Sequence, residues 1–129
     1  MYDSPTTEAK PGKVTTLTVM TLISGIVNIL WGIGLTATIV LGSFGIGLIC
    51  APVTILPAVL GIFEILFASK LLSNPPSPTK PSQTLAILEI CCILVGNLIS
   101  LAAGIVALVM YNDPEVERFF AQLNAGIPE

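Results

Sequence analysis

Two glutamates stand out in this sequence, because each is the only charged residue in a long apolar stretch. Glu64 lies within residues 60–66 and Glu89 within the similar residues 85–91, on either side of a proline-rich loop. If both stretches are membrane helices joined by that loop, the two carboxyl groups lie at a similar depth, near the cytoplasmic interface. Paired carboxyl groups inside a membrane can share a proton or bind a cation. Glu64 and Glu89 are therefore a candidate ion or proton site.

A purely structural role for these two glutamates is the alternative. Each carboxylate could reach the membrane interface, or bond to Lys70, to a neighbouring amide or to hydroxyl groups of the first helix. The shallow depth expected for Glu64 and Glu89 favours this structural role.

Few other residues could do chemistry. The sequence has no histidine, and its Asp and Cys residues lack the spacing of a catalytic or metal site. Cys50, Cys91 and Cys92 all lie in apolar segments, where we expect them to be small packing residues. We therefore expect no enzyme activity, no metal site and no cofactor.

The composition predicts an integral membrane protein. The chain has 129 residues, of which 53% are hydrophobic and 10% charged, and its mean hydropathy is +0.92. Soluble domains carry about 25% charged residues. Five Lys and Arg residues and a pI near 4.7 also exclude a nucleic-acid-binding protein.

The uncharged runs predict an all-α fold, a polytopic transmembrane helical bundle with a short amphipathic C-terminal helix. About 20 apolar residues are enough to cross the hydrocarbon core. Glycines within residues 42–47 provide a first turn, and Pro52 and Pro57 should kink the second helix. A further split between residues 50 and 57 would give four shorter spans instead of three. The expected ranges are a polar tail at 1–13, three long spans at about 14–41, 46–72 and 82–111, and the C-terminal helix at 112–129.

The basic residues predict the orientation, because Lys and Arg concentrate on the cytoplasmic side of membrane proteins. Three spans place all four lysines on one side and Arg118 alone on the other, whereas four spans remove this bias. We therefore expect the N-terminus in the cytoplasm and the C-terminus outside.

Small and polar residues recur at four-residue spacing in the predicted spans, as in helices that pack closely in lipid. The amides of Asn28 and Asn97 should face protein, where they form interhelical hydrogen bonds or coordinate a ligand. The interfaces could lie within one chain or between copies of it. The expected packing residues are Ser24, Asn28 and Gly32 in the first span, Gly61 in the second, and Gly96, Asn97, Ser100 and Gly104 in the third.

The C-terminal segment predicts an amphipathic helix. Asp113 is a good N-cap, and Pro114 suits the first helical position. The polar face is mainly acidic, which does not favour binding to an anionic lipid surface. The helix should instead dock on a partner subunit or fold back on its own bundle. Its apolar stripe consists of Val116, Phe119, Phe120 and Leu123.

Residues 96–101 and 112–116, Gly-Asn-Leu-Ile-Ser-Leu and Asn-Asp-Pro-Glu-Val, resemble the last span of small uncharacterised bacterial multi-span membrane proteins. The resemblance covers roughly the last third of the chain. It implies a bacterial inner membrane and a regular helical bundle, and it implies no particular activity.

These patterns favour a structural or accessory subunit of a membrane complex, or a homo-oligomer. The expected partners are the lipid bilayer and other membrane subunits or copies of the chain, without nucleic acid. One alternative is a proton- or cation-conducting oligomer that uses Glu64 and Glu89. Another is a subunit that binds lipid, quinone or pigment, with Trp31 among its contacts.

Overall fold

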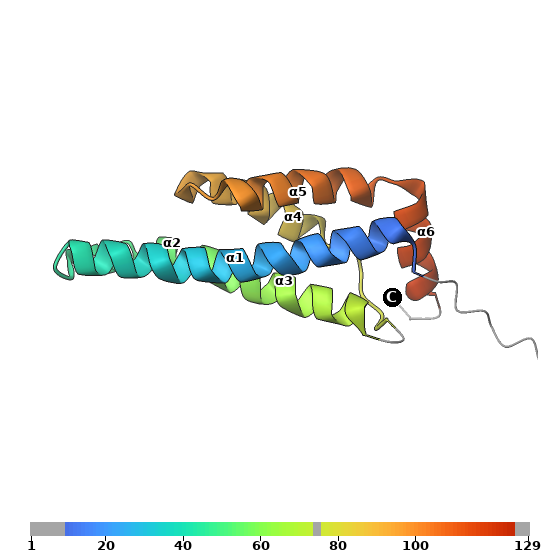
Figure 1. Cartoon of the computed structure of the whole chain (residues 1–129), viewed down its shortest axis with the longest axis horizontal. Coiled ribbons are helices and arrows are strands. Elements are labelled where there is room, and N and C mark those ends of the chain that lie inside the picture. Colours follow the sequence, from blue (N-terminus) through green and yellow to red (C-terminus); the bar gives the residue numbers. More distant parts are fainter. Residues whose placement is uncertain (1–9, 74–75, 126–129) are drawn as a thin grey trace, which may run out of the picture.

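The computed structural model describes residues 10–73 and 76–125, and this part of the chain contains helices and no strand. Two long helical segments lie side by side, a shorter helical pair packs against them, and a last helix crosses one end (Figure 1). The prediction of an all-α bundle is confirmed. In chain order the elements are α1 (Gly12–Gly42), η1 (Ile46–Ile49), α2 (Ala51–Thr54), α3 (Leu56–Leu72), α4 (Gln83–Cys91), η2 (Cys92–Val95), α5 (Leu98–Tyr111) and α6 (Pro114–Leu123).

The long helix α1 confirms the first predicted span. Its 31 residues extend roughly 46 Å at about 1.5 Å per residue, more than the hydrocarbon core of about 30 Å. Phe44 and Gly45 then reverse the chain with φ angles of 53° and 92°. Backbone bonds from Gly45 N to Val40 O and from Phe44 N to Leu41 O close the helix end, as in a Schellman motif.

The second predicted span is one continuous path with two breaks. Elements η1, α2 and α3 follow one another back along α1 without reversing (Figure 1). Pro52 and Pro57 lie in the first turns of α2 and α3, where a missing backbone N–H costs nothing. The prolines therefore lie at breaks where new helical segments begin, and the alternative of four spans is wrong.

Glycines let α1 and α3 approach closely. A Cβ added at Gly25 would lie 2.8 Å from the carbonyl oxygen of Gly61, and one added at Gly32 would lie 2.5 Å from the backbone nitrogen of Ala58. Further along, the hydroxyls of Thr36 and Thr54 hydrogen-bond at 2.8 Å. The α1–α3 interface therefore lies within one chain.

The prediction of one continuous helix over 82–111 is wrong. The chain breaks after η2, where Gly96 has a φ of 79°, and Asn97 caps a new helix through its side chain. Bonds from Asn97 N to Cys92 O and from Gly96 N to Ile93 O form a second Schellman motif. Because of this turn, α4 and α5 form a helical hairpin.

Contacts along the hairpin show that α5 runs back beside α4. The Tyr111 side chain at the end of α5 lies close to the backbone of Ser82, just before α4. Midway, a Cβ at Gly104 would lie 2.5 Å from the carbonyl oxygen of Ala86 and 2.9 Å from Cβ of Glu89. The hairpin enters and leaves at the same end of the bundle.

The described N- and C-terminal segments therefore meet at one end, which contradicts the expected exit on the opposite side. Lys13 forms ion pairs with Asp113 at 2.7 Å and with Glu115 at 3.5 Å. The same end also contains Arg118, on α6, which we expected to lie alone on the far side (Figure 1). The error arises because one wrongly continuous helix inverts the position of everything after it.

The predicted C-terminal helix is confirmed as α6. Asp113 accepts a hydrogen bond from the backbone N–H of Glu115, and Pro114 opens the helix. Lys13 and this N–H hold the pKa of Asp113 below its usual value. The carboxylate thus contributes stability that is fully present above the usual pKa of Asp and is lost as the pH falls through this lowered pKa.

The apolar stripe of α6 packs on the protein's own helices, which corrects its assignment to partner docking. Val116 and Phe120 are buried in a core with Leu17, Phe67 and Tyr111. Phe119 and Leu123 are partly buried against the same core. Of the two outcomes considered for this helix, folding back on its own bundle is the one observed. The parts of the predicted polar tail and C-terminal helix at residues 1–9 and 126–129 lie outside the described residues.

Among the described residues, two segments are long and apolar enough to cross a membrane, Gly12–Gly42 and Ala51–Leu72. The pair α5 and α6 would make a third if counted together, but the two helices meet at a bend of 79°. The chain is therefore a helical membrane protein with one long hairpin and one shorter hairpin beside it.

The glycine contact between α1 and α3 predicts a position-specific loss of stability. Gly25→Ala should lower the free energy of unfolding by about 1–3 kcal/mol, because its Cβ collides with the Gly61 carbonyl. Gly34→Ala in the same helix is the control, since its Cβ meets nothing within 4 Å. Unfolding in detergent micelles measures both, and equal stabilities would contradict the close contact.

The hairpin of α4 and α5 predicts that the loop before α4 and helix α6 face the same side of the membrane. Lys80→Cys and Glu117→Cys, each in a chain whose three cysteines are replaced by serine, should react with an impermeant maleimide from the same side of sealed vesicles. Reaction from opposite sides would mean that the chain crosses the membrane between them.

Candidate functional site

Six polar side chains from three parts of the fold meet in the bundle interior. Helix α1 contributes Ser24 and Asn28, α3 contributes Glu64, and the shorter hairpin contributes the rest. Each is at most 2% exposed. The members are Ser24, Asn28, Glu64, Glu89, Asn97 and Ser100, which we call the buried polar cluster.

Asn28 lies at the centre of the hydrogen bonds in this cluster. Its Nδ2 donates to Glu64 Oε2 at 2.8 Å and to Ser100 Oγ at 3.2 Å, and its Oδ1 accepts from Asn97 Nδ2. Glu64 Oε1 lies 3.4 Å from the hydroxyl of Ser24, which donates to it. A single side chain thus joins α1 to both of the other parts of the bundle.

The two predicted carboxyl groups are close neighbours inside the bundle. The Ser24 hydroxyl donates to Glu64 and also lies near Glu89. Glu89 Oε1 is buried and has no hydrogen-bond partner in the described part of the chain. The ion pairs found between described residues all involve Lys13, so neither Glu64 nor Glu89 is paired with a cation there.

The position of this cluster follows from local sequence. Ser24 and Asn28 are four residues apart on α1, so they lie on one face, together with Gly32 and Thr36. Gly25 and Gly61 bring the backbones of α1 and α3 into contact beside Glu64. The small residue Gly104 leaves room for Glu89 on the other side of the hairpin.

The turn between η2 and α5 positions the last two members. Asn97 Oδ1 accepts from the backbone N–H of Ser100 at 3.1 Å, so this side chain caps α5 and also reaches Asn28. Since a cap lies at a helix end, these contacts require the break at residues 92–97. The same break brings Ser100 onto the face that meets α1.

Trp31 also holds the shorter hairpin in place, a role that the sequence prediction does not include. Its indole N–H donates to the carbonyl oxygen of Val95 at 3.0 Å, so α1 holds the tip of the shorter hairpin. The available signal was the dipeptide Gly96-Asn97, which favours a helix end followed by a helix cap. The predicted helix over residues 82–111 instead includes Gly96 and Asn97 in its interior.

The structure brings together most of the residues singled out from the sequence. Ser24, Asn28, Asn97 and Ser100 join the two glutamates, whereas Gly32, Gly61 and Gly104 lie at close backbone contacts. Gly96 is the exception, because it lies in the turn with a positive φ rather than on a packing face. Glu64 bonds to an amide and to a hydroxyl of the first helix, which are partners expected for a structural role. No bond to Lys70 is found among described residues.

The three cysteines are unpaired. Cys92 is buried beside Ser100, while Cys50 and Cys91 are exposed. No group of three or more His, Cys, Asp or Glu side chains that could hold a metal was found among the described residues.

No family model, curated protein or solved structure matches this chain.

The central place of Asn28 predicts a large effect of its removal. Asn28→Ala should cost about 1–3 kcal/mol of unfolding free energy for each buried partner left unsatisfied. Thr38→Ala is the matched control in α1, because Thr38 is exposed and bonds only to Gly34 of its own helix. Denaturant unfolding in micelles gives both values, and a tolerated Asn28→Ala would contradict the network.

Proposed function

We propose that this protein is a small membrane protein that binds and transfers protons at the Glu64–Glu89 pair, either alone or as an oligomer. One observation carries the proposal: two carboxyl groups from different parts of the bundle meet in a buried cluster, and no described basic residue pairs with either of them. Ionisable residues in membrane helices are costly, so a pair of them placed together favours a functional role.

The energetics favour a bound proton. Two adjacent carboxylates repel each other, and removing an unpaired charge from water costs several kcal/mol. One proton shared between Glu64 and Glu89 removes one charge and adds a hydrogen bond. Asn28 and Ser24 then donate to the oxygens of Glu64, which stabilises the remaining charge.

The hydrogen-bond directions favour a proton over a metal cation. Asn28 presents its N–H group to Glu64, and an N–H group repels a cation. Each of the two amide oxygens already accepts one hydrogen bond, Asn28 Oδ1 from Asn97 and Asn97 Oδ1 from the Ser100 backbone, so each has one lone pair left for a cation. A cation site would need these oxygens as ligands.

The charge distribution supports a cytoplasmic location for the end that contains the described termini. This end contains the contacts of Lys10 with Leu71, of Lys13 with Asp113 and of Asn124 with Thr79, next to Lys80. Lys70 lies in the last turn of α3 and Arg118 on α6, both at the same end. Because Lys and Arg concentrate on the cytoplasmic side of membrane proteins, we infer that this end faces the cytoplasm. The resemblance in the last third of the chain favours the inner membrane of a bacterium.

A structural role, as an accessory subunit or a homo-oligomer, is the second candidate. The opposite end of the α1–α3 hairpin is free of charge and strongly exposed, with Phe44 99% exposed and Ile49 83% exposed. The shorter hairpin stops near Trp31 and does not cover this end (Figure 1). Such an apolar surface suits contact with lipid, with other membrane subunits or with copies of the chain.

Proton transfer by the pair predicts flux that depends on both glutamates. The purified protein in liposomes should dissipate a pH gradient, measured with an enclosed pH-sensitive dye. Glu64→Gln and Glu89→Gln should each abolish the flux, because the pair can no longer exchange its proton. Glu117→Gln, which removes an exposed carboxylate on α6, should leave the flux unchanged.

Two outcomes would contradict the proton-transfer proposal. The first is a folded wild-type protein without proton flux, which would favour the structural role. The second is flux that survives Glu64→Gln and Glu89→Gln, which would place the path elsewhere. Circular dichroism of each variant in the same liposomes verifies that the helices remain intact.

A further inference from the structure

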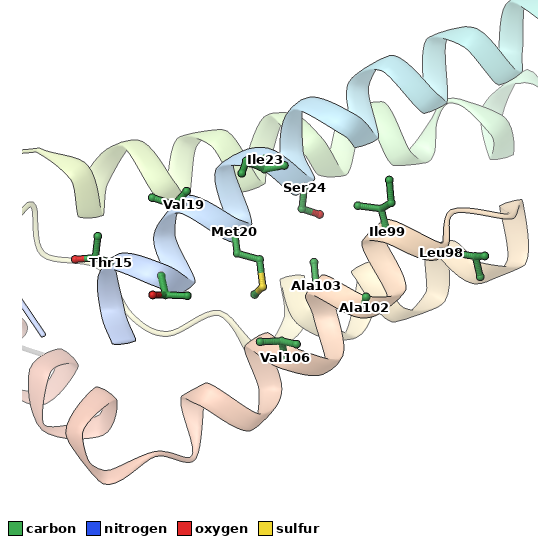
Figure 2. Close-up of a pocket in the computed structure, with 11 residues that line it drawn as sticks. Thr15, Val19, Met20, Ile23, Ser24, Leu98, Ile99, Ala102, Ala103 and Val106 are labelled. Carbon is green, nitrogen blue, oxygen red and sulfur yellow. The ribbon is translucent and has the colours of Figure 1, made fainter. Parts of the chain in front are cut away.

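A groove lies between α1 and α5, and its lining includes Ser24 of the buried polar cluster (Figure 2). Its volume is about 720 Å³. Small-molecule sites usually have volumes of about 300–1,000 Å³. Val19 and Ile23 on one wall and Ile99 and Val106 on the other are exposed, so the groove opens toward the lipid.

The lining of the groove limits the chemistry of an occupant. It contains no charged side chain, and its side-chain oxygens are the hydroxyls of Thr15, Thr16 and Ser24. Thr15 and Thr16 lie toward the charged end, whereas Ser24 is about 12 Å further along α1 at about 1.5 Å per residue. The groove therefore offers no partner for a charged headgroup near Ser24, so a molecule whose polar group reaches Ser24 should be uncharged there.

Ser24 connects the groove to the carboxyl pair. Its side chain points toward Ala103 of α5 across the groove (Figure 2), and it is only 1% exposed. The hydroxyl can donate one hydrogen bond and accept two, and it donates to Glu64 Oε1. No described residue donates to its oxygen among the hydrogen bonds found. The unpartnered Glu89 Oε1 beside it shows that the cluster has unused acceptor capacity.

We propose that this groove binds an uncharged amphiphile with one apolar chain and a hydroxyl head, placed so that the head donates to Ser24 Oγ. The chain lies between Met20 and the α5 wall, and the head completes the hydrogen bonds of Ser24. Fatty alcohols, prenols and quinols share this chemistry. The binding requires no proton transfer, so it goes beyond the function proposed above and can stand or fail independently.

Photolabelling in liposomes tests the binding. Three probes carry the same diazirine on the chain: hexadecanol, its methyl ether, and phosphatidylcholine. Hexadecanol should label the groove residues, as located by peptide mass spectrometry. Its methyl ether, which has no donor, should label them about two- to tenfold less, as expected for the loss of one hydrogen bond.

Variants assign the labelling to the groove. Ala102→Phe fills the groove from α5 and should abolish labelling by hexadecanol. Ile105→Phe is the matched control, because Ile105 is exposed on α5 but does not line the groove. Ser24→Ala should reduce labelling by hexadecanol to the level of the methyl ether, without changing labelling by the ether itself.

Three results would overturn this inference. Equal labelling by phosphatidylcholine would show that ordinary lipid chains fill the groove. Equal labelling in Ala102→Phe and Ile105→Phe would place the bound probe elsewhere. Crosslinks from Ala102→Cys to a second copy of the chain, with hexadecanol excluded, would show that another protomer occupies the groove. None of these readouts measures flux. Groove binding can therefore be refuted while proton transfer is confirmed, and proton transfer can be refuted while groove binding is confirmed.

Discussion

Two neighbouring carboxyl groups inside an apolar bundle are the constraint on which the rest of this structure depends. Water cannot screen Glu64 and Glu89 there, and the described residues supply no cation to either. The bundle compensates with the hydrogen-bond donors of Ser24 and Asn28. Since these donors lie on α1, the approach of α1 to α3 through Gly25 and Gly61 is a requirement of the site as much as of the fold.

The break at residues 92–97 is the second structural requirement. A straight helix over 82–111 would place Asn97 and Ser100 beyond Glu89 along the same axis. The Schellman turn at Gly96 instead folds α5 back, so Asn97 both caps α5 and donates to Asn28. Trp31 holds the turn through the carbonyl of Val95. A polar helix end inside a membrane is tolerated only when protein satisfies it, as these contacts do.

The sequence alone was sufficient for the class of fold, the long hairpin and the glutamate pair. Those features follow from composition, from the turn within residues 42–47 and from charge placement, which are local signals. The reversal at Gly96 was missed because an apolar run has the same hydropathy whether it crosses the membrane or turns back. A cap such as Asn97 could have predicted it, but the packing of Gly104 on Ala86 depends on residues distant in sequence. The same error put α6 on the wrong side, and only the tertiary structure shows that Val116 and Phe120 belong to the protein's own core.

Infrared difference spectroscopy tests the central claim, that Glu64 and Glu89 share one proton in a dry site. The protein in lipid should show the carbonyl stretch of a protonated carboxyl group near neutral pH. Both Glu64→Gln and Glu89→Gln should remove or shift that band, because the proton belongs to the pair. A spectrum without the band, or one that responds to only one of the two substitutions, would contradict the shared proton.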